Sequence, residues 1–270
     1  MLPCWEMPYS QEIETARRAA KLSAELALRH QKAGVFAENK PDNSPVTIAD
    51  KECEKLIAKL LEEAYPDDGI LGEEGARKES KNGRRWIIDP IDGTRDFVRG
   101  NPLWSVLIAL EKEGEVQAGV VHLPQMGNTC WGSRGGGSFR NGIRLKVSSI
   151  SAPEHAVISL NSLNRIKSAS LRDLLTSYLT LFWAFRCLGG TPDAMMLAEG
   201  QMDAWVEPKV APWDMAAAQV ILEEAGAVFF AFNGKRSIYE GNCVACTPGL
   251  EASMREFFTR IAEHGSDLCG

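Results

Sequence analysis

Apolar and polar residues follow one another along this chain with two periods, one typical of helices and one typical of strands. Apolar residues recur every three or four positions over residues 10–33 and again over 49–64, which predicts two amphipathic helices. Ser10 is expected to cap the first helix, because its hydroxyl can accept from free backbone N–H groups. Gly34 is expected to end that helix, since glycine readily adopts the left-handed backbone found at helix ends.

The middle of the chain has the pattern of a β-sheet. Residues 84–89 are predicted to form a strand, and residues 103–111 and 115–122 a hairpin, with further short strands after it. The glycine-rich run from Gly132 to Gly137 lacks the Gly-Lys-Ser/Thr ending of a phosphate-binding loop and opens no helix. It is therefore predicted to form turns between short strands.

Strands and helices alternate in the second half of the chain. The predicted strands are 156–160, 203–206, 227–231 and 242–246, and the predicted helices are about 169–178, 193–200, 214–225 and 249–263. This order fits stacked sheets and helices better than a doubly wound nucleotide-binding fold. No repeat, low-complexity tract or linker interrupts the pattern, so residues 1–270 are predicted to form a single domain.

Composition narrows the class of protein. With 44% hydrophobic and 24% charged residues, the chain is an ordinary globular protein, and its net charge of −6 argues against nucleic acid as a partner. No signal peptide is recognised at the start, and no stretch reaches the ~18 apolar residues of a membrane helix. Seven scattered cysteines predict a reduced, cytoplasmic protein, in which Cys243 and Cys246 are structural rather than a redox or zinc pair.

The most informative motif follows the predicted strand 84–89. Asp89 and Asp92 bracket a proline and are followed by Gly93, which lets the backbone approach a ligand, and by Thr94. Oxygen ligands gathered at the end of a strand suit Mg²⁺, which binds one or two carboxylates together with water and a substrate phosphate. The alternative is an Asp-rich turn after a core strand.

Two further acidic residues stand in similar places. Glu73 ends another apolar run, in Ile70-Leu71-Gly72-Glu73-Glu74-Gly75, and Asp214 stands before a helical apolar pattern in Pro212-Trp213-Asp214. Asp214 alone would be explained as the cap of that helix. The presence of three acidic motifs in one chain favours a shared cation site.

These motifs resemble those of the inositol monophosphatase superfamily of Mg²⁺-dependent phosphatases. The matching segments are G-E-E, D-P-I-D-G-T and W-D-x-A-A, and a fourth, Ser44 to Asp50, looks like the family segment S-P-V-T-x-A-D. The resemblance covers residues 10 to 260. It implies an α+β fold, the layered αβαβα sandwich of the inositol monophosphatase and fructose-1,6-bisphosphatase type, and a homodimer.

The resemblance also implies roles for individual residues. Thr94 would orient the attacking water with support from Asp50, which could instead bind a third metal. The backbone N–H groups of Gly93, Thr94 and Arg95 would hold the phosphate if a helix begins there. Two or three Mg²⁺ ions would be bound by Glu73, Asp89, Ile91, Asp92 and Asp214. Ile91 would contribute its backbone carbonyl. Glu73 would also be a catalytic residue.

The substrate is expected to be a small phosphorylated metabolite. Gly100 to Leu110 resembles the G-x-P-x-W-x-x-L-I-A-L segment of the histidinol-phosphatase branch, although that branch usually has Gly-Asp where this chain has Gly189-Gly190. By resemblance Glu207 would contact the part of the substrate that is not phosphate, and Asp193 would also suit a cationic substrate.

The leading hypothesis is therefore a Mg²⁺-dependent histidinol-phosphate phosphatase of histidine biosynthesis. An inositol-1-monophosphatase of broad specificity is the alternative within the family. The alternative from a different class is that this chain is catalytically silent and binds a phosphate ligand or acts as a scaffold.

Overall fold

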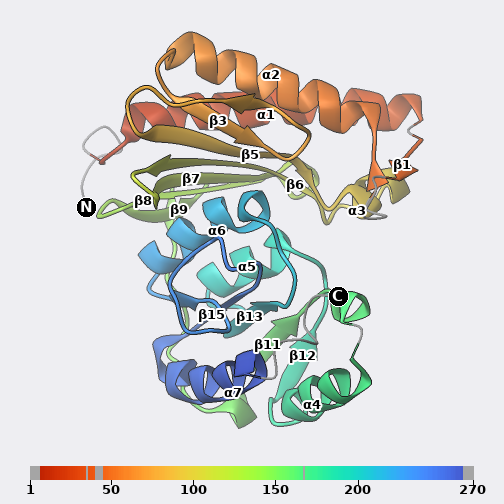
Figure 1. Ribbon diagram of the computed structural model, residues 1–270, viewed down its shortest axis with the longest axis vertical. Coiled ribbons are helices and arrows are strands. Elements are labelled where there is room, and N and C mark those ends of the chain that lie inside the picture. Colours follow the sequence, from red (N-terminus) through yellow and green to blue (C-terminus); the bar gives the residue numbers. More distant parts are fainter. Residues whose placement is uncertain (1–6, 35, 40–44, 167, 264–270) are drawn as a thin grey trace.

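The computed structural model describes residues 7–34, 36–39, 45–166 and 168–263. It has five layers, which Figure 1 shows from top to bottom: two helices, an eight-stranded sheet, two helices, a five-stranded sheet and two outer helices. The expected layered αβαβα sandwich of the α+β class is confirmed.

The eight-stranded sheet is built almost entirely from the first half of the chain. Its strand order is β10-β9-β8-β7-β6-β5-β3-β4, and all neighbours are antiparallel except β3 and β5. The strands are β3 (Gly69–Gly72), β4 (Arg77–Lys78), β5 (Arg84–Asp92), β6 (Ser105–Lys112), β7 (Glu115–Leu123), β8 (Asn128–Ser133), β9 (Gly137–Arg140) and β10 (Ile143–Arg144). Two short strands, β1 (Glu38–Asn39) and β2 (Pro45–Val46), pair separately.

Strand β5 extends beyond its predicted end at residue 89 and carries the acidic motif within it. Asp89 pairs with Leu107 and Asp92 pairs with Ser105, so β5 contains one more residue than β6 over this interval. The bulge falls between Asp89 and Asp92, an interval that contains Pro90, which has no N–H to donate and is tolerated in strands at such irregularities. The bulge places the two aspartates at the end of the sheet with different partners.

The five-stranded sheet belongs to the second half of the chain. Its order is β12-β11-β13-β15-β14, and β11 is parallel to both of its neighbours. The strands are β11 (Val157–Leu160), β12 (Ala184–Arg186), β13 (Ala204–Glu207), β14 (Val228–Phe230) and β15 (Cys243–Cys246). Cys243 packs into the core between the two sheets and Cys246 into the core on the other side of β15, which confirms that they are no redox pair.

The helices form where the apolar pattern predicted them, except for the short helix after Gly93, which was expected only as a condition for phosphate binding. Their bounds are α1 (Ser10–Ala33), α2 (Ile48–Ala64), α3 (Thr94–Arg99), α4 (Ala169–Leu179), α5 (Thr191–Ala198), α6 (Pro212–Glu224) and α7 (Glu251–Glu263). The prediction that Ser10 caps α1 is wrong, because Tyr9 holds that position in a left-handed conformation and no side chain caps the helix. Gly34 ends α1 with φ 89° as predicted.

The glycine-rich run forms the turn between β8 and β9, as predicted. The carboxylate of Glu224 accepts from the N–H groups of Gly135 and Gly137 at 2.9 and 2.8 Å. These N–H groups are therefore held by a neighbouring helix end and not by a phosphate.

Three hydrophobic clusters separate the layers. In the first cluster, α1 and α2 pack on the eight-stranded sheet, and the small alanines of α1 allow a close approach. The middle cluster contains residues from both halves of the chain, such as Ile87 and Leu107 with Trp205 and Met215. This core joins the two halves of the chain, and the single domain over residues 1–270 stays a prediction. Within the described residues, no helix is both long and apolar enough to traverse a membrane.

Helix α6 lies directly on strand β7. A Cβ atom at Gly119 would stand 2.6 Å from the carbonyl oxygen of Ala217 and 2.8 Å from its Cα. Real Cβ atoms do not approach backbone so closely, so only glycine fits at this point of the strand. Figure 1 shows α6 in the middle layer, between the two sheets.

Candidate active site

A cavity of about 380 Å³ opens where β5 and β13 end and where α3 and α6 begin. All predicted site residues line it except Asp50 and Asp193. Those that line it are Glu73, Asp89, Ile91, Asp92, Gly93, Thr94, Arg95, Glu207 and Asp214. The fold thus brings together residues that lie far apart in the sequence.

Three carboxylates form a tight group at one end of the cavity. Glu73, Asp89 and Asp214 each offer an oxygen, and these oxygens all lie within 4.8 Å of one another. Strands β3 and β5 are parallel neighbours, and the N–H of Glu73 donates to the carbonyl of Ile88 at 3.1 Å, so Glu73 and Asp89 reach the same sheet end. This oxygen-rich set fits Mg²⁺.

Burial makes this group costly to ionise. Burial raises the pKa of Asp89 well above its ordinary value, and the charges of Glu73, Asp92 and Asp214 raise it further. Burial, Asp92 and Glu73 raise the pKa of Asp214 to about 7. Like charges this close oppose one another, and a divalent cation would remove the opposition. The donor set therefore fits the metal that the motifs imply.

Asp214 serves its helix and the cluster together. It is the third residue of α6, and its Oδ2 accepts from the N–H of Ala211 at 2.9 Å. A carboxylate here satisfies a free N–H at the start of the helix. The helix-capping explanation and the cation-site explanation of Asp214 are thus both compatible with the structure.

Asp92 lies beside the cluster rather than in it. Its Oδ2 accepts from the hydroxyl of Ser105 and from the N–H of Thr191, both at 3.2 Å. A Cβ at Gly190 would come within 3.1 Å of the same oxygen, so an Asp at that position would set a second carboxylate against Asp92. This contact gives a physical reason for glycine at position 190. That Asp92 binds one of the Mg²⁺ ions stays a prediction.

Thr94 and Asp50 are joined as the motif suggested. The Thr94 hydroxyl lies 3.4 Å from Asp50 Oδ1 and 3.3 Å from the carbonyl of Ile91, the two acceptors available for its single proton. Asp50 is fixed in turn by Thr47, whose N–H and hydroxyl donate to its Oδ2 at 2.7 and 2.6 Å. Asp50 stands behind Thr94 and not in the cavity lining, a position that suits a supporting residue.

The segment that follows Asp92 has the geometry that the phosphate prediction required. Helix α3 begins at Thr94, and Gly93 precedes it with φ 85°. A Cβ at Gly93 would lie 2.8 Å from the carbonyl oxygen of Leu103, so glycine is needed for this close turn. Arg95 and Lys209 line the same cavity and bring positive charge to it.

Glu207 ends strand β13 at the other side of the cavity. Its Oε1 accepts from Asn161 Nδ2 at 2.7 Å and from Trp205 Nε1 at 3.2 Å. Burial raises its pKa to about 8, against the hydrogen bonds from Asn161 and Trp205 that lower it. A cation placed here would favour the ionised form.

The prediction that Asp193 contacts the substrate is wrong. Asp193 is fully buried and does not line the cavity. Its Oδ2 accepts instead from Ser159, Asn161 and the N–H groups of Leu188 and Gly189. Because the carboxylate stands in the first turn of α5, it meets these nearby donors before it can reach the cavity.

The sequence model of the inositol monophosphatase family matches residues 7–265. The chain belongs to the inositol monophosphatase family. The histidinol-phosphatase of Chlorobaculum parvum is 38% identical to it over 85% of this chain and 87% of that protein. The Nus factor SuhB of Vibrio cholerae is 33% identical over 94% of this chain and 95% of that protein. The solved structure of a Thermotoga maritima IMPase matches with a TM-score of 0.85 at 28% identity, covering 94% and 99% of the two chains.

The resemblance seen in the motifs is thereby confirmed. As a member of the inositol monophosphatase family, the chain belongs among hydrolases of phosphate monoesters, which generally depend on Mg²⁺. The metal at the acidic cluster and the individual substrate go beyond this statement.

Sequence reasoning missed Glu54, a residue that supports the family's acidic cluster. Its carboxylate accepts from the N–H groups of Glu74 and Ala76 at 2.7 and 2.6 Å and thereby fixes the turn that follows Glu73. Glu54 lies one helical turn after Asp50 on α2, on the buried face of the helix. A carboxylate at that spacing within an apolar helix face is the signal that could have identified it.

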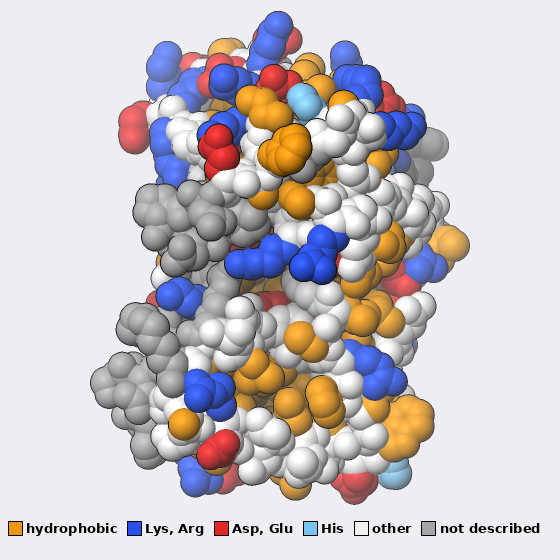
Figure 2. All heavy atoms as spheres, turned by 90° about the vertical axis from the view of Figure 1, so that its right-hand side faces the viewer, with side chains coloured by type: hydrophobic (Ala, Val, Ile, Leu, Met, Phe, Trp, Pro, Cys, Tyr) orange, Lys and Arg blue, Asp and Glu red, His pale blue; other side chains and the backbone are white. Residues whose placement is uncertain are grey.

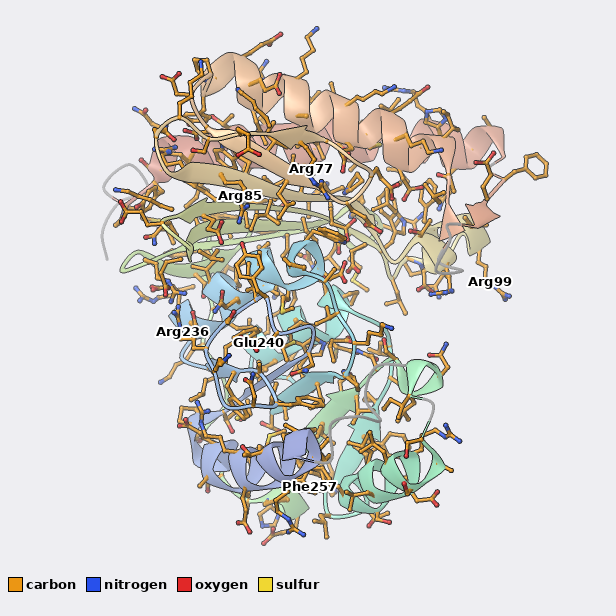
Figure 3. All side chains as sticks on the ribbon, in the orientation of Figure 1. Arg77, Arg85, Arg99, Arg236, Glu240 and Phe257 are labelled. Carbon is orange, nitrogen blue, oxygen red and sulfur yellow. The ribbon has the colours of Figure 1, made fainter. Side chains whose placement is uncertain are left out.

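A side chain of β4 crosses between the layers to Trp213, which lines the cavity. Arg77, labelled in Figure 3, extends from β4 so that its guanidinium lies 5.8 Å from the centre of the Trp213 ring on α6. Arg77 also donates to the carbonyl of Ala76 at 2.8 Å and to that of Gly72. The turn that carries Glu73 is therefore held from this side as well.

Proposed function

We propose that this protein is a Mg²⁺-dependent phosphomonoester hydrolase whose substrate is histidinol phosphate, in histidine biosynthesis. The observation that carries the proposal is the placement of the carboxylate cluster, Thr94 and the buried Glu207 around one cavity. The relatives named histidinol-phosphatase, at 38% identity, support the substrate.

Glu73, Asp89 and Asp214 would hold Mg²⁺, with Asp92 beside them. When bound, Mg²⁺ supplies charge neutralisation on the phosphoryl oxygens and lowers the pKa of water. No Cys or Ser nucleophile is needed for this reaction, because water attacks the phosphorus directly.

The chain's own residues would position that reaction. The Thr94 proton is directed to Asp50 or to the Ile91 carbonyl, so the hydroxyl oxygen is left to accept from the attacking water. The backbone N–H groups at the start of α3 would bind the phosphate, since anions are favoured at helix N-termini. Arg95 and Lys209 add positive charge at the same cavity.

Glu207 would bind the leaving alcohol. Histidinol phosphate carries an ammonium and an imidazole, and a buried carboxylate stabilises a positive charge that has left water. An inositol 1-phosphate would offer only hydroxyls to the same side chain. The structural match to an IMPase supports this second substrate, so a phosphatase of broader range is the alternative.

A substrate panel tests the proposal. Phosphate release from histidinol phosphate and inositol 1-phosphate is measured with and without Mg²⁺ for the wild type and Glu207→Gln. A hydrogen bond to a charged group is worth about 1.5–3 kcal/mol, so kcat/KM for histidinol phosphate should fall roughly tenfold to a hundredfold. Inositol 1-phosphate should be affected far less, because glutamine still bonds hydroxyls. Equal losses on both would contradict the substrate assignment.

The alternative of another class predicts no turnover. A silent phosphate-binding or scaffold protein has no need to retain buried carboxylates that repel one another, whereas a hydrolase does. The net charge of −6 supports the expectation that nucleic acid is no partner. The free thiols among the described cysteines agree with a cytoplasmic location, which stays a prediction.

A homodimer is also proposed. Strand β12 is an edge of the five-stranded sheet, and the apolar side chains of Leu181, Trp183 and Phe185 around it are 57%, 74% and 57% exposed. Figure 2 shows hydrophobic side chains gathered on the lower part of this face of the molecule. Exposed apolar surface of this kind favours a protein contact. Sedimentation velocity should show a dimer that Trp183→Glu weakens, and a monomeric wild type would contradict the proposal.

A further inference from the structure

One buried amide connects two buried carboxylates beside the cavity. Asn161 Nδ2 donates to Asp193 Oδ2 at 3.0 Å and to Glu207 Oε1 at 2.7 Å. The three residues come from β11's end, α5 and β13, and each is at most 4% exposed. Both partners are acceptors, so the amide nitrogen must be the atom that faces them. Asn161 is the group that allows Asp193 and Glu207 to lie close together.

Asp193 also holds the loop that borders the cavity. The N–H groups of Leu188 and Gly189 donate to its Oδ2 at 3.3 and 3.2 Å, and the Ser159 hydroxyl donates at 2.6 Å. Gly189 and Gly190, which belong to this loop, line the cavity. One carboxylate therefore fixes both the loop and the amide that reaches Glu207.

The two oxygens of Glu207 have different surroundings. Oε1 accepts from Asn161, which does not line the cavity, and from Trp205, which does, so both of its hydrogen bonds are made within the protein. Oε2 lies 3.4 Å from the hydroxyl of Ser162, which does line it. Ser162 adopts φ 57°, a conformation uncommon for a residue other than glycine, and so turns into the cavity directly after Asn161.

We propose that Asn161 and Asp193 are positioning residues that set substrate preference through Glu207, an inference that rests on the proposed function. They hold Oε1 so that Oε2 is presented to the leaving alcohol of the substrate. They also fix the loop at 187–190 opposite it. Neither residue touches the substrate, and neither binds the metal.

A double-mutant cycle tests the connection to Glu207. Asn161→Ala is made in the wild type and in Glu207→Gln, and kcat/KM is measured for histidinol phosphate and inositol 1-phosphate. In the wild type, Asn161→Ala should lower the ratio of kcat/KM for histidinol phosphate to kcat/KM for inositol 1-phosphate about tenfold. Glu207→Gln should change this ratio in the same direction. In the Glu207→Gln background it should change the ratio less than about twofold, because coupled residues are not additive.

Two further variants guard against a general folding effect. Asn161→Ser keeps a smaller donor and should give an intermediate ratio. Asn233→Ala removes an amide that donates to Glu240 at 2.6 Å on an exposed loop, and it should leave the ratio unchanged. The Mg²⁺ concentration for half-maximal activity should stay the same throughout. Equal losses on both substrates, or the same loss in both backgrounds, would overturn the proposal.

Thiol labelling gives a readout that needs no enzymatic activity. Cys187 is exposed and lies at the start of the loop that Asp193 holds. Asp193→Ala should raise the rate at which Cys187 reacts with a thiol reagent at least severalfold. The rise should disappear when Cys187→Ser is combined with Asp193→Ala. Asp173→Ala, at an exposed position of α4, is the matched control.

The two measurements separate two kinds of failure. A wild type that hydrolyses neither substrate would refute the proposed function, while an unchanged labelling rate in Asp193→Ala would refute the positioning of the loop.

Discussion

The two ends of the cavity are stabilised in opposite ways. At the metal end, Glu73, Asp89 and Asp214 lie within 4.8 Å of one another, and burial and mutual repulsion raise the pKa of Asp89 and Asp214. At the substrate end, Glu207 and Asp193 are both buried and receive hydrogen bonds from Asn161 and neighbouring groups. The first end would be stabilised by a cation from outside the chain, as proposed above, whereas the second is already organised by hydrogen bonds within the protein.

This difference predicts that the two ends of the cavity respond to different changes. Removing an ion should disable the metal end without disturbing the substrate end. Substitutions at the substrate end should change which monoester is preferred while leaving the metal in place. The following predictions test that separation, beginning with the largest expected effect.

Chelation should abolish activity. With EDTA the wild type should lose essentially all turnover, and added Mg²⁺ should restore it, because only a cation offsets the repulsion within the cluster. Mg²⁺ should also raise the melting temperature, as any ligand of the folded state does. Phosphate release and thermal unfolding in the same buffers measure both effects. Full turnover in chelator would contradict the metal-dependent mechanism.

Thr94→Ala should lower kcat by roughly two to four orders of magnitude, the range for losing a positioned proton-transfer group. The Mg²⁺ concentration for half-maximal activity should change little, since the hydroxyl is engaged with Asp50 and Ile91. Thr94→Ser keeps the hydroxyl and serves as the matched control. Near-normal turnover of the alanine variant would remove Thr94 from the catalytic role.

Glu54→Gln should weaken Mg²⁺ binding more than it lowers the maximal rate. The amide replaces one of the two acceptor oxygens that hold the turn after Glu73, and such a bond to a charged group is worth about 1.5–3 kcal/mol. The half-saturating Mg²⁺ concentration should therefore rise about tenfold or more, with kcat at saturation within a few-fold. Glu62→Gln, at an exposed position of the same helix, should change neither. Unchanged Mg²⁺ affinity in Glu54→Gln would contradict this support.

The smallest expected effect concerns stability and pH. Burial raises the pKa of Glu207 to about 8 in the folded protein, whereas it is near its ordinary 4.5 when unfolded. Below about 4.5 both states carry the proton, and as pH rises toward 8 only the unfolded state loses it, so the metal-free protein loses stability over this range. Glu207→Gln lacks this titration.

The melting temperature of metal-free Glu207→Gln should thus gain several degrees on the wild type between pH 5 and pH 8. Thermal unfolding in chelator measures the difference, with Glu62→Gln as the control that should parallel the wild type. If the melting temperatures of Glu207→Gln and of the wild type changed with pH in the same way, Glu207 would not be buried as a neutral acid.

The metal end could be predicted from sequence because each of its residues sits in a local motif. Asp89, Asp92 and Thr94 follow one apolar strand, and Asp214 stands where a helix must begin. The end of β5 was misplaced, however, because the bulge between Asp89 and Asp92 depends on pairing with β6, which periodicity does not record.

The substrate end could be predicted only in part. Glu207 was identified through the family resemblance, but the orientation of Asp193 depends on loop N–H groups whose positions follow from tertiary packing. Asn161 carries no motif at all, and its importance comes from two partners 32 and 46 residues away. Ser10 failed as a cap for a local reason, since Tyr9 takes the left-handed conformation there.

The contact of Gly119 with Ala217 sets how closely α6 approaches the eight-stranded sheet. Asp89 belongs to the sheet and Asp214 to the helix that rests on it, so the height of that helix above the sheet sets the span of the acidic cluster. Gly119 touches no ligand, yet any side chain there would lift α6 and draw Asp214 away from its partners. The spacing of the three carboxylates is thus fixed by the absence of a side chain at one position of β7.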